Sequence, residues 1–185
     1  MGSFEGVKEM RYTIQSGILT AEASQEVLAK IKSTVIGPVK KIYINGDELV
    51  LKTDICPCDV CSGYTGDVRS KEYVMVSGSG ERIAVGYPGY SEGEDPDVIG
   101  WPICRMPKVD HASITAKEAK YSLTMHNSRN YSLSDTAGQE LLRIFHKGIA
   151  GGWNLEDRQG FAPEVLCGIF TFCRYLEQEN EFLIV

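Results

Sequence analysis

The sequence predicts a mainly β domain with some α-helix, in which antiparallel strands form a barrel closed around one apolar C-terminal helix. Two observations favour this fold class. Short segments of alternating apolar and polar residues recur between turn signals about every ten residues, which is typical of sandwiches and barrels. The segment 165–173 is apolar apart from Gly168 and Thr171. A helix that is apolar on all sides must be buried on all sides or lie in a membrane, and this one is too short to span a bilayer comfortably.

The first part of the chain is expected to contain a strand and then a helix. Met10, Tyr12 and Ile14 alternate with polar residues, which indicates a strand. The segment "TAEASQEVLAKIKS" places Val27, Leu28 and Ile31 at helical spacing, with Thr20 as a candidate N-cap. We therefore expect one peripheral helix near residues 21–32, with its apolar stripe packed on the core.

Hairpins are expected to follow. Asn45-Gly46 lies between two alternating runs, and this dipeptide is the strongest short hairpin signal in a sequence. Residues 78–80, "GSG", are a second hairpin turn signal, between the next two alternating runs. Four further strands are expected to begin near Tyr121, Tyr131, Leu141 and Trp153.

The C-terminal helix is expected to run from Pro163 to about Glu179. Pro163 suits the first helical turn, where its missing N–H costs nothing, and Glu164 suits the positive end of the helix dipole. Such a helix is roughly 25 Å long at 1.5 Å per residue.

Segment 86–110 is expected to be a long irregular excursion, because it holds four of the seven prolines. Residues 53–110 carry ten acidic side chains against five basic ones. The group Glu92, Glu94, Asp95 and Asp97 lacks the regular ligand spacing of a calcium-binding EF-hand loop, so a solvated acidic loop is favoured over a calcium site. Tyr87, Tyr90, Trp101 and Met106 offer contact anchors, although packing over one end of the barrel is favoured.

Length and composition are those of a globular protein. The 185 residues suit a single domain spanning 1–185, and 43% are hydrophobic while 24% are charged. A chain of this length can bury a sizeable core without disulfides or a metal ion.

The charge balance excludes one class of partner. The net charge is −6 and the pI is about 5.1, which argues against nucleic-acid binding because that function requires a basic surface. The N-terminal residues lack a signal peptide, no segment reaches the roughly 18 apolar residues of a membrane span, and the six cysteines are expected to stay reduced. We therefore expect a cytoplasmic protein without a transmembrane segment.

Two segments resemble a known fold family. "NYSLSDTAGQELLRIFHK", residues 130–147, resembles the strand, turn and strand unit of the plant LURP-one-related proteins, and "PEVLCGIFTFCRYLEQENEF", residues 163–182, resembles their closing core helix. These proteins share the tubby-like fold with tubby C-terminal domains and phospholipid scramblases. The resemblance implies a closed antiparallel barrel of about twelve strands around a central hydrophobic helix. The partner that we expect for such a protein is an anionic membrane lipid, such as a phosphoinositide, or a protein.

No functional residue is carried over from that family. The phosphoinositide site of tubby depends on basic residues, and the only adjacent basic pair here is Lys40-Lys41, which is read as a solvated strand end. The middle excursion and the cysteine cluster depart from the family pattern.

The segment "ICPCDVC" is the sharpest candidate for chemistry. Cys56, Cys58 and Cys61 place three thiols within six residues, and Zn²⁺ prefers four tetrahedral ligands. The fourth ligand would be Cys104, or failing that His111. The alternative is a loop with three reduced cysteines, and no other cofactor is expected. Cys167 and Cys173, on the C-terminal helix, are read as buried structural thiols.

No motif indicates an enzyme. The chain has three histidines: Asp110 and His111 are not expected to face each other in a strand, His126 lies in a predicted turn, and His146 ends a strand. We therefore expect a non-catalytic cytosolic binding or scaffold protein for a membrane lipid or a protein partner. The alternative is a zinc-binding protein that uses the cysteine cluster.

Overall fold

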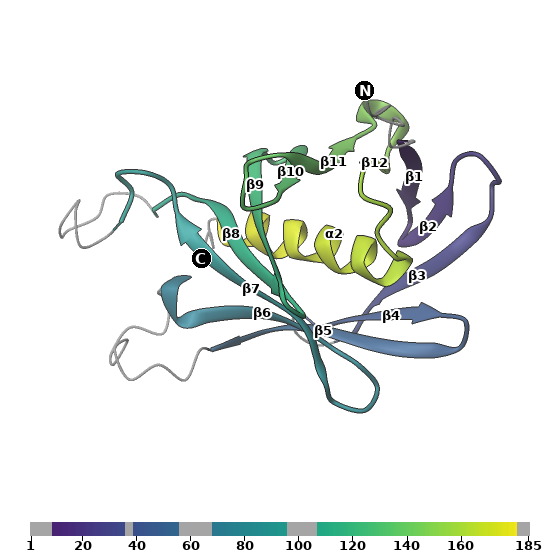
Figure 1. Cartoon of the computed structure of the whole chain (residues 1–185), viewed down its shortest axis with the longest axis horizontal. Helices are drawn as coiled ribbons and strands as arrows, with labels where there is room; N and C mark the ends of the chain where they lie inside the picture. The colour runs from purple at the N-terminus through teal and green to yellow at the C-terminus, as the bar shows by residue number, and fades with distance from the viewer. Residues whose placement is uncertain (1–8, 36–38, 56–67, 96–106, 181–185) are drawn as a thin grey trace, which may run out of the picture.

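The computed structural model describes residues 9–35, 39–55, 68–95 and 107–180. Twelve strands of this part of the chain form one closed antiparallel barrel, which confirms the predicted fold class (Figure 1). The strands are β1 (Met10–Gln15), β2 (Ile18–Ala21), β3 (Val27–Ser33), β4 (Lys40–Ile44), β5 (Asp47–Ile55), β6 (Lys71–Val76), β7 (Arg82–Tyr90), β8 (Val109–Ala116), β9 (Ala119–Asn127), β10 (Asn130–Ser134), β11 (Glu140–His146) and β12 (Trp153–Asp157). Two short 3₁₀ turns, η2 (Val68–Ser70) and η3 (Gly148–Ala150), lie between strands.

Each strand pairs with the next one along the chain, and β12 returns to pair with β1. Tyr12 lies opposite Leu155 in this closing pair. Closure leaves no strand edge exposed, which removes the template for edge-to-edge aggregation. Nine of the twelve strand pairs are hairpins or short connections that local turn chemistry can specify, such as Asn45-Gly46, whose φ angles of 49° and 93° are both left-handed.

Helix α2 (Pro163–Gln178) runs through the interior of the barrel (Figure 1). It packs against two groups of neighbouring strands in the barrel wall, β3 to β6 and β8 to β9. Ten of its sixteen residues are buried: Leu166, Cys167, Gly168, Ile169, Phe170, Thr171, Phe172, Cys173, Tyr175 and Leu176. This confirms the predicted central helix and its start at Pro163. The polar Thr171 is satisfied because its hydroxyl donates to the carbonyl of Cys167 at 2.8 Å.

The inward side chains of the strands complete the core around α2. The ring of Tyr73 on β6 lies 5.8 Å from that of Phe172 and 5.4 Å from that of Tyr175. Two glycines permit the close approach: an added Cβ on Gly168 would lie 2.7 Å from the sulfur of Met75, and one on Gly86 would lie 3.3 Å from the ring of Phe172. Packing therefore fixes the position of the helix against β6 and β7.

Polar contacts fix both ends of the helix. The buried carboxylate of Asp157 accepts hydrogen bonds from the backbone N–H groups of Gln159, Gly160 and Phe161 at 2.8 to 3.0 Å, which turns the chain from β12 towards α2. At the other end, the amide of Asn180 pairs with both backbone groups of Val109, at 2.9 and 2.7 Å. The side-chain amide of Asn180 thereby pairs with the backbone at the start of β8 in the way that a neighbouring strand would.

The predicted helix near residues 21–32 is wrong, and Thr20 is not an N-cap. These residues form the end of β2, a turn and β3, with Leu19 opposite Ala29 and Ile18 opposite Lys30. The helical spacing of Val27, Leu28 and Ile31 does not correspond to one buried face, since Val27 is 52% exposed. Tertiary context outweighs local propensity because β1 and β4 need partners to close the barrel.

The predicted excursion over 86–110 is wrong at both ends. Strand β7 continues through Pro88 to Tyr90, and β8, which the sequence analysis missed, begins at Val109. Pro88 lies opposite Ala112 in a regular part of this pair. Residues 96–106 lie outside the described part of the chain.

Phe170→Asp is expected to leave the protein insoluble. Phe170 is 9% exposed and its ring lies 5.5 Å from that of Trp153, so the substitution buries an unpaired carboxylate at a cost of several kcal/mol, comparable to the whole free energy of unfolding. The measurement is the soluble yield and the thermal melt. Tyr87→Asp, on an aromatic residue that is 44% exposed, is the matched control and should stay soluble. A soluble Phe170→Asp protein with a native-like cooperative melt would contradict the central role of α2.

Candidate functional site

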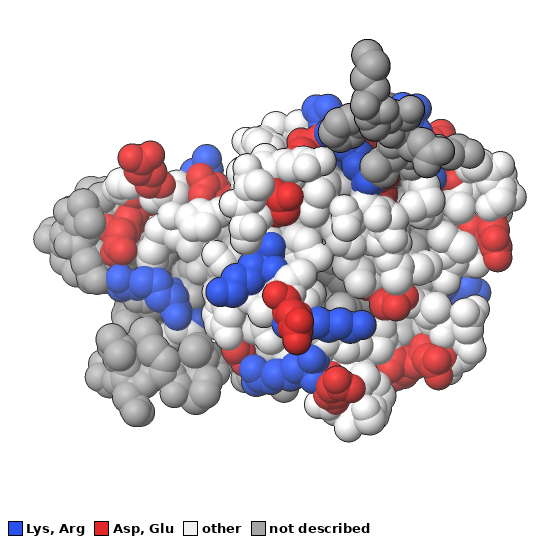
Figure 2. Space-filling model, viewed as in Figure 1, with Lys and Arg blue, Asp and Glu red and all other residues white. Residues whose placement is uncertain are grey.

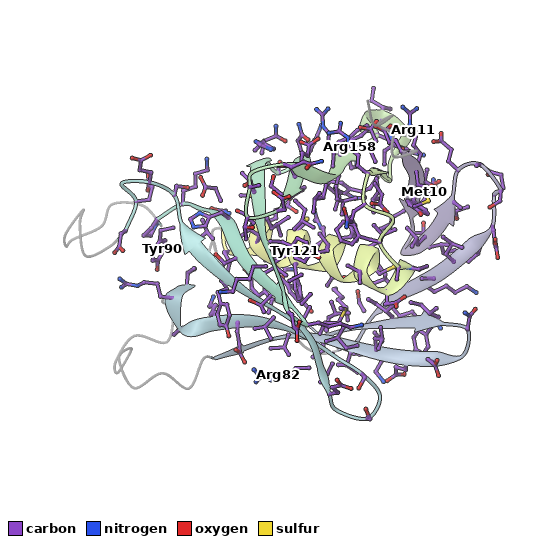
Figure 3. The ribbon with its side chains drawn as sticks, in the orientation of Figure 1. Met10, Arg11, Arg82, Tyr90, Tyr121 and Arg158 are labelled. Atoms are coloured by element: carbon purple, nitrogen blue, oxygen red, sulfur yellow. The ribbon has the colours of Figure 1, made fainter. Side chains whose placement is uncertain are left out.

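An apolar cavity of about 560 Å³ lies between the first turns of α2 and one end of strands β6 to β9. Figure 3 labels Tyr121, which lies inside the barrel beside α2 and forms part of the wall. The ring of Phe161 packs edge-on against Tyr121 at 5.9 Å. The lining residues are Met75, Ile83, Ala84, Ile114, Ala116, Lys117, Glu118, Ala119, Tyr121, Phe161, Val165, Gly168, Ile169 and Phe172.

Small residues on facing walls create this cavity. Ala84 on β7 and the cross-strand pair Ala116 and Ala119 on β8 and β9 line it, whereas the space beside Gly168 on the helix is filled by the sulfur of Met75. Along β9 the inward positions otherwise hold large residues, such as Leu123, which is fully buried. The helix is thus packed tightly over its C-terminal half and leaves room beside its N-terminal half.

In the part of the chain that the structure describes, the charged residues that line the apolar cavity are Lys117 and Glu118. They form the two-residue turn between β8 and β9, and both are exposed. The cavity therefore has apolar walls and a mouth that carries one positive and one negative side chain.

A second cavity, also of about 560 Å³, lies on the surface beside the β9–β10 turn. Its lining residues are Asn127, Ser128, Arg129, Asn130, Arg143, Phe145 and His146, among which there is no carboxylate. Nδ1 of His146 accepts a hydrogen bond from the backbone N–H of Gly148 at 3.0 Å, so the neutral ring carries its proton on Nε2. This depression has the donors and positive charge that suit an anion.

Surface charge is otherwise mixed. Figure 2 shows acidic and basic side chains interspersed on the viewed face, without a continuous patch of one sign. Lys41, from the basic doublet, pairs with the carboxylate of Glu48 at 2.7 Å, and Lys40 donates to the hydroxyl of Ser33 at 2.8 Å. The doublet therefore lies at the start of β4, and both ammonium groups have side-chain partners, where the sequence predicted a solvated strand end.

Two partly buried charged side chains of the helix, Arg174 and Glu177, pair with each other beside Trp153. Arg174 forms an ion pair with Glu177 and lies over the ring of Trp153 at 5.4 Å. His146 and Phe170 also pack edge-on against Trp153. The aromatic face and the carboxylate together compensate the partial burial of the guanidinium.

The predicted metal ligands Cys56, Cys58, Cys61 and Cys104 all lie outside the described residues, so the zinc hypothesis stays a prediction. Within the described ranges, no group of three His, Cys, Asp or Glu side chains comes close enough to hold a metal ion. Cys167 and Cys173 are buried, as expected. Burial raises the pKa of the Cys167 thiol to about 12 and also raises that of Cys173, so neither thiol is a nucleophile at neutral pH.

Two predictions about the histidines are wrong. Asp110 and His111 do contact each other, with 2.9 Å between the carboxylate and Nδ1, since a bulge in the β7–β8 pair breaks the strand alternation here. His126 lies in strand β9 and its Nε2 is 2.8 Å from the hydroxyl of Ser132. In the part of the chain that the structure describes, no carboxylate contacts His126, so a hydrolytic triad is not assembled there.

The described acidic residues near 92–95 contact their neighbours. Asp95 pairs with Arg69 at 3.3 Å, and Glu94 accepts a weak hydrogen bond from the backbone N–H of Lys108 at 3.4 Å. Tyr90 packs on the core and its hydroxyl accepts from the backbone N–H of Val68, which agrees with the favoured packing role. Tyr87 is exposed, while Asp97, Trp101 and Met106 lie outside the described residues.

No family model matches the sequence, and no curated protein or solved structure matches it either. A search of the described helices finds none that is long and apolar enough to cross a membrane.

Proposed function

We propose that this chain is a non-catalytic binding protein that holds the apolar part of a lipid or a lipid-like small molecule. The observation that carries the proposal is the apolar cavity of about 560 Å³ beside α2, whose volume falls within the usual range for small-molecule sites. Location in the cytoplasm and membership of the tubby-like fold family are part of the same proposal, and they rest on the sequence resemblance.

The energetics of the cavity support a binding role. An apolar cavity lowers stability in proportion to its volume, because the groups that line it lose packing partners. Leucine at any of the alanine positions of the wall would fill part of this space, yet Ala84, Ala116 and Ala119 leave it open. An apolar ligand would restore the missing contacts.

The lining also supports binding over catalysis. Tyr121, Lys117 and Glu118 supply its ionisable groups, and the two charged residues are exposed at the mouth. General acid–base catalysis requires groups within hydrogen-bond reach of one another and of the substrate, which apolar walls do not offer.

Binding of the neutral fluorescent probe N-phenyl-1-naphthylamine tests this proposal. The native protein is expected to bind the probe in saturable fashion, and Ala116→Leu should weaken binding at least tenfold because the new side chain occupies the cavity. The melting temperature of Ala116→Leu should stay the same or rise, since filling a cavity stabilises a protein. Ala150→Leu, at an exposed position, is the matched control. Equal affinity of the native and Ala116→Leu proteins, or no binding by the native protein, would refute the proposal.

A second candidate function is contact with an anionic membrane surface. The observation that favours it is the depression with Arg129 and Arg143, whose lining contains no carboxylate. Phosphate-bearing headgroups, including phosphoinositides, are the ligands that such paired guanidinium groups suit.

Co-sedimentation with vesicles tests the membrane proposal. The double variant Arg129→Gln/Arg143→Gln is expected to bind phosphatidylserine-containing vesicles roughly thirtyfold more weakly, since each basic residue near such a surface contributes about 1 kcal/mol. Arg11→Gln/Arg158→Gln is the matched control (Figure 3), because it removes the same charge from residues that pair with Glu9 and Glu140. Equal weakening by both pairs would show a general charge effect and would contradict a site at the β9–β10 turn.

A further inference from the structure

The turn that forms the mouth of the apolar cavity is Lys117-Glu118, which connects β8 and β9. Lys117 adopts a left-handed backbone conformation, with φ of 54°. Side chains other than Gly, Asn and Asp rarely adopt this conformation, because Cβ comes too close to the following carbonyl. Ser16 and Asn45, the first residues of two other two-residue turns, share this conformation, but each is followed by a glycine, whereas Lys117 is followed by Glu118.

The ammonium group of Lys117 is available for a ligand. Among the described residues it has neither an ion-pair partner nor a hydrogen bond, and the side chain lines the apolar cavity while remaining exposed. The adjoining residues of the hairpin, Ala116 and Ala119, lie opposite each other and carry no charge. Among the described residues that line the apolar cavity, Lys117 is the basic one.

The negative charge of Glu118 does not prevent Lys117 from binding an anionic group. Glu118 lines the apolar cavity and also a more polar depression, which includes Lys120, Asp135 and Gln159. Lys117 does not line that second depression. The two charged side chains at the mouth thus differ in their surroundings. Glu118 lines both depressions, whereas Lys117 lines the apolar cavity and not the more polar depression.

We infer that the apolar cavity binds a fatty-acid-like monocarboxylate, with the hydrocarbon chain beside α2 and the carboxylate at Lys117. This inference rests on the proposed function and adds the chemical class of the ligand. Lys117 places an ammonium group at the mouth of an apolar cavity, and a carboxylate is the group that such a charge pairs with in a charge-assisted hydrogen bond.

Chain length gives a first readout. Affinity for a series of saturated alkanoates, measured by displacement of N-phenyl-1-naphthylamine, is expected to rise about fourfold per methylene group, the value for burying one such group. The rise should stop at the length that fills the cavity.

Headgroup preference gives the decisive readout. The native protein is expected to bind dodecanoate about fivefold more tightly than dodecanol, and more tightly than dodecylamine, since an exposed ion pair contributes a factor of this size. The preference should decrease in high salt, because the ion pair is exposed. Preference for dodecylamine, or no preference for dodecanoate over dodecanol, would overturn the inference.

Substitutions at the mouth separate binding from folding. Lys117→Gln is expected to weaken dodecanoate binding about fivefold and to leave dodecanol binding unchanged, while the matched control Lys120→Gln should change neither. Glu118→Gln should strengthen dodecanoate binding, because it removes a like charge. Lys117→Gly should raise the melting temperature and still weaken dodecanoate binding, a combination that a purely structural role cannot produce.

The outcomes of these experiments distinguish failure of the carboxylate inference from failure of the proposed binding function on which it rests. If dodecanoate and dodecanol bind equally and Lys117→Gln changes neither affinity, the carboxylate assignment fails while the binding function stands. If neither compound nor the neutral probe binds the native protein, the proposed function fails and the inference fails with it.

Discussion

Burial of a helix that is apolar on every side is the constraint on which the rest of this structure depends. Residues 166–173 of α2 are buried around the whole circumference of the helix, so a single sheet packed on one face could not cover them. A closed barrel covers them all and pairs every strand edge at the same time. Fully burying each large side chain contributes about 1.5 to 3 kcal/mol, so the helix supplies a large share of the core that the barrel needs.

This constraint also explains where the special residues lie. Gly86 and Gly168 permit close approach of the wall and the helix, and Asp157 and Asn180 fix the two helix ends with hydrogen bonds to backbone groups. The apolar cavity arises where the fit is incomplete, between the N-terminal half of the helix and the alanines of β7 to β9. The candidate binding site is therefore a consequence of how the helix occupies the barrel, and the charges among its described lining residues come from the turn at the mouth.

The sequence predicted the elements whose signals are local and missed those set by tertiary context. Pro163 and the apolar run after it predicted α2, and Asn45-Gly46 predicted a hairpin that has the required left-handed angles. The helix predicted for residues 21–32 was wrong because the helical spacing of their apolar residues is a coincidence. These residues belong to strands that pair with their neighbours to close the barrel. The cavity could not be predicted, because an unfilled volume depends on which small residues face one another. The left-handed lysine turn could not be predicted either, since Lys117 carries no turn signal of its own.

Native-state hydrogen exchange of the α2 amides tests the central claim most directly. If the helix is the core around which the barrel closes, the amides from Cys167 to Cys173 should exchange only through global unfolding. Their exchange free energies would then equal the free energy of unfolding and would fall with denaturant with the same slope. Exchange of these amides through smaller, denaturant-independent openings, while the strand amides stay protected, would show that the barrel stands without the helix and would contradict the account.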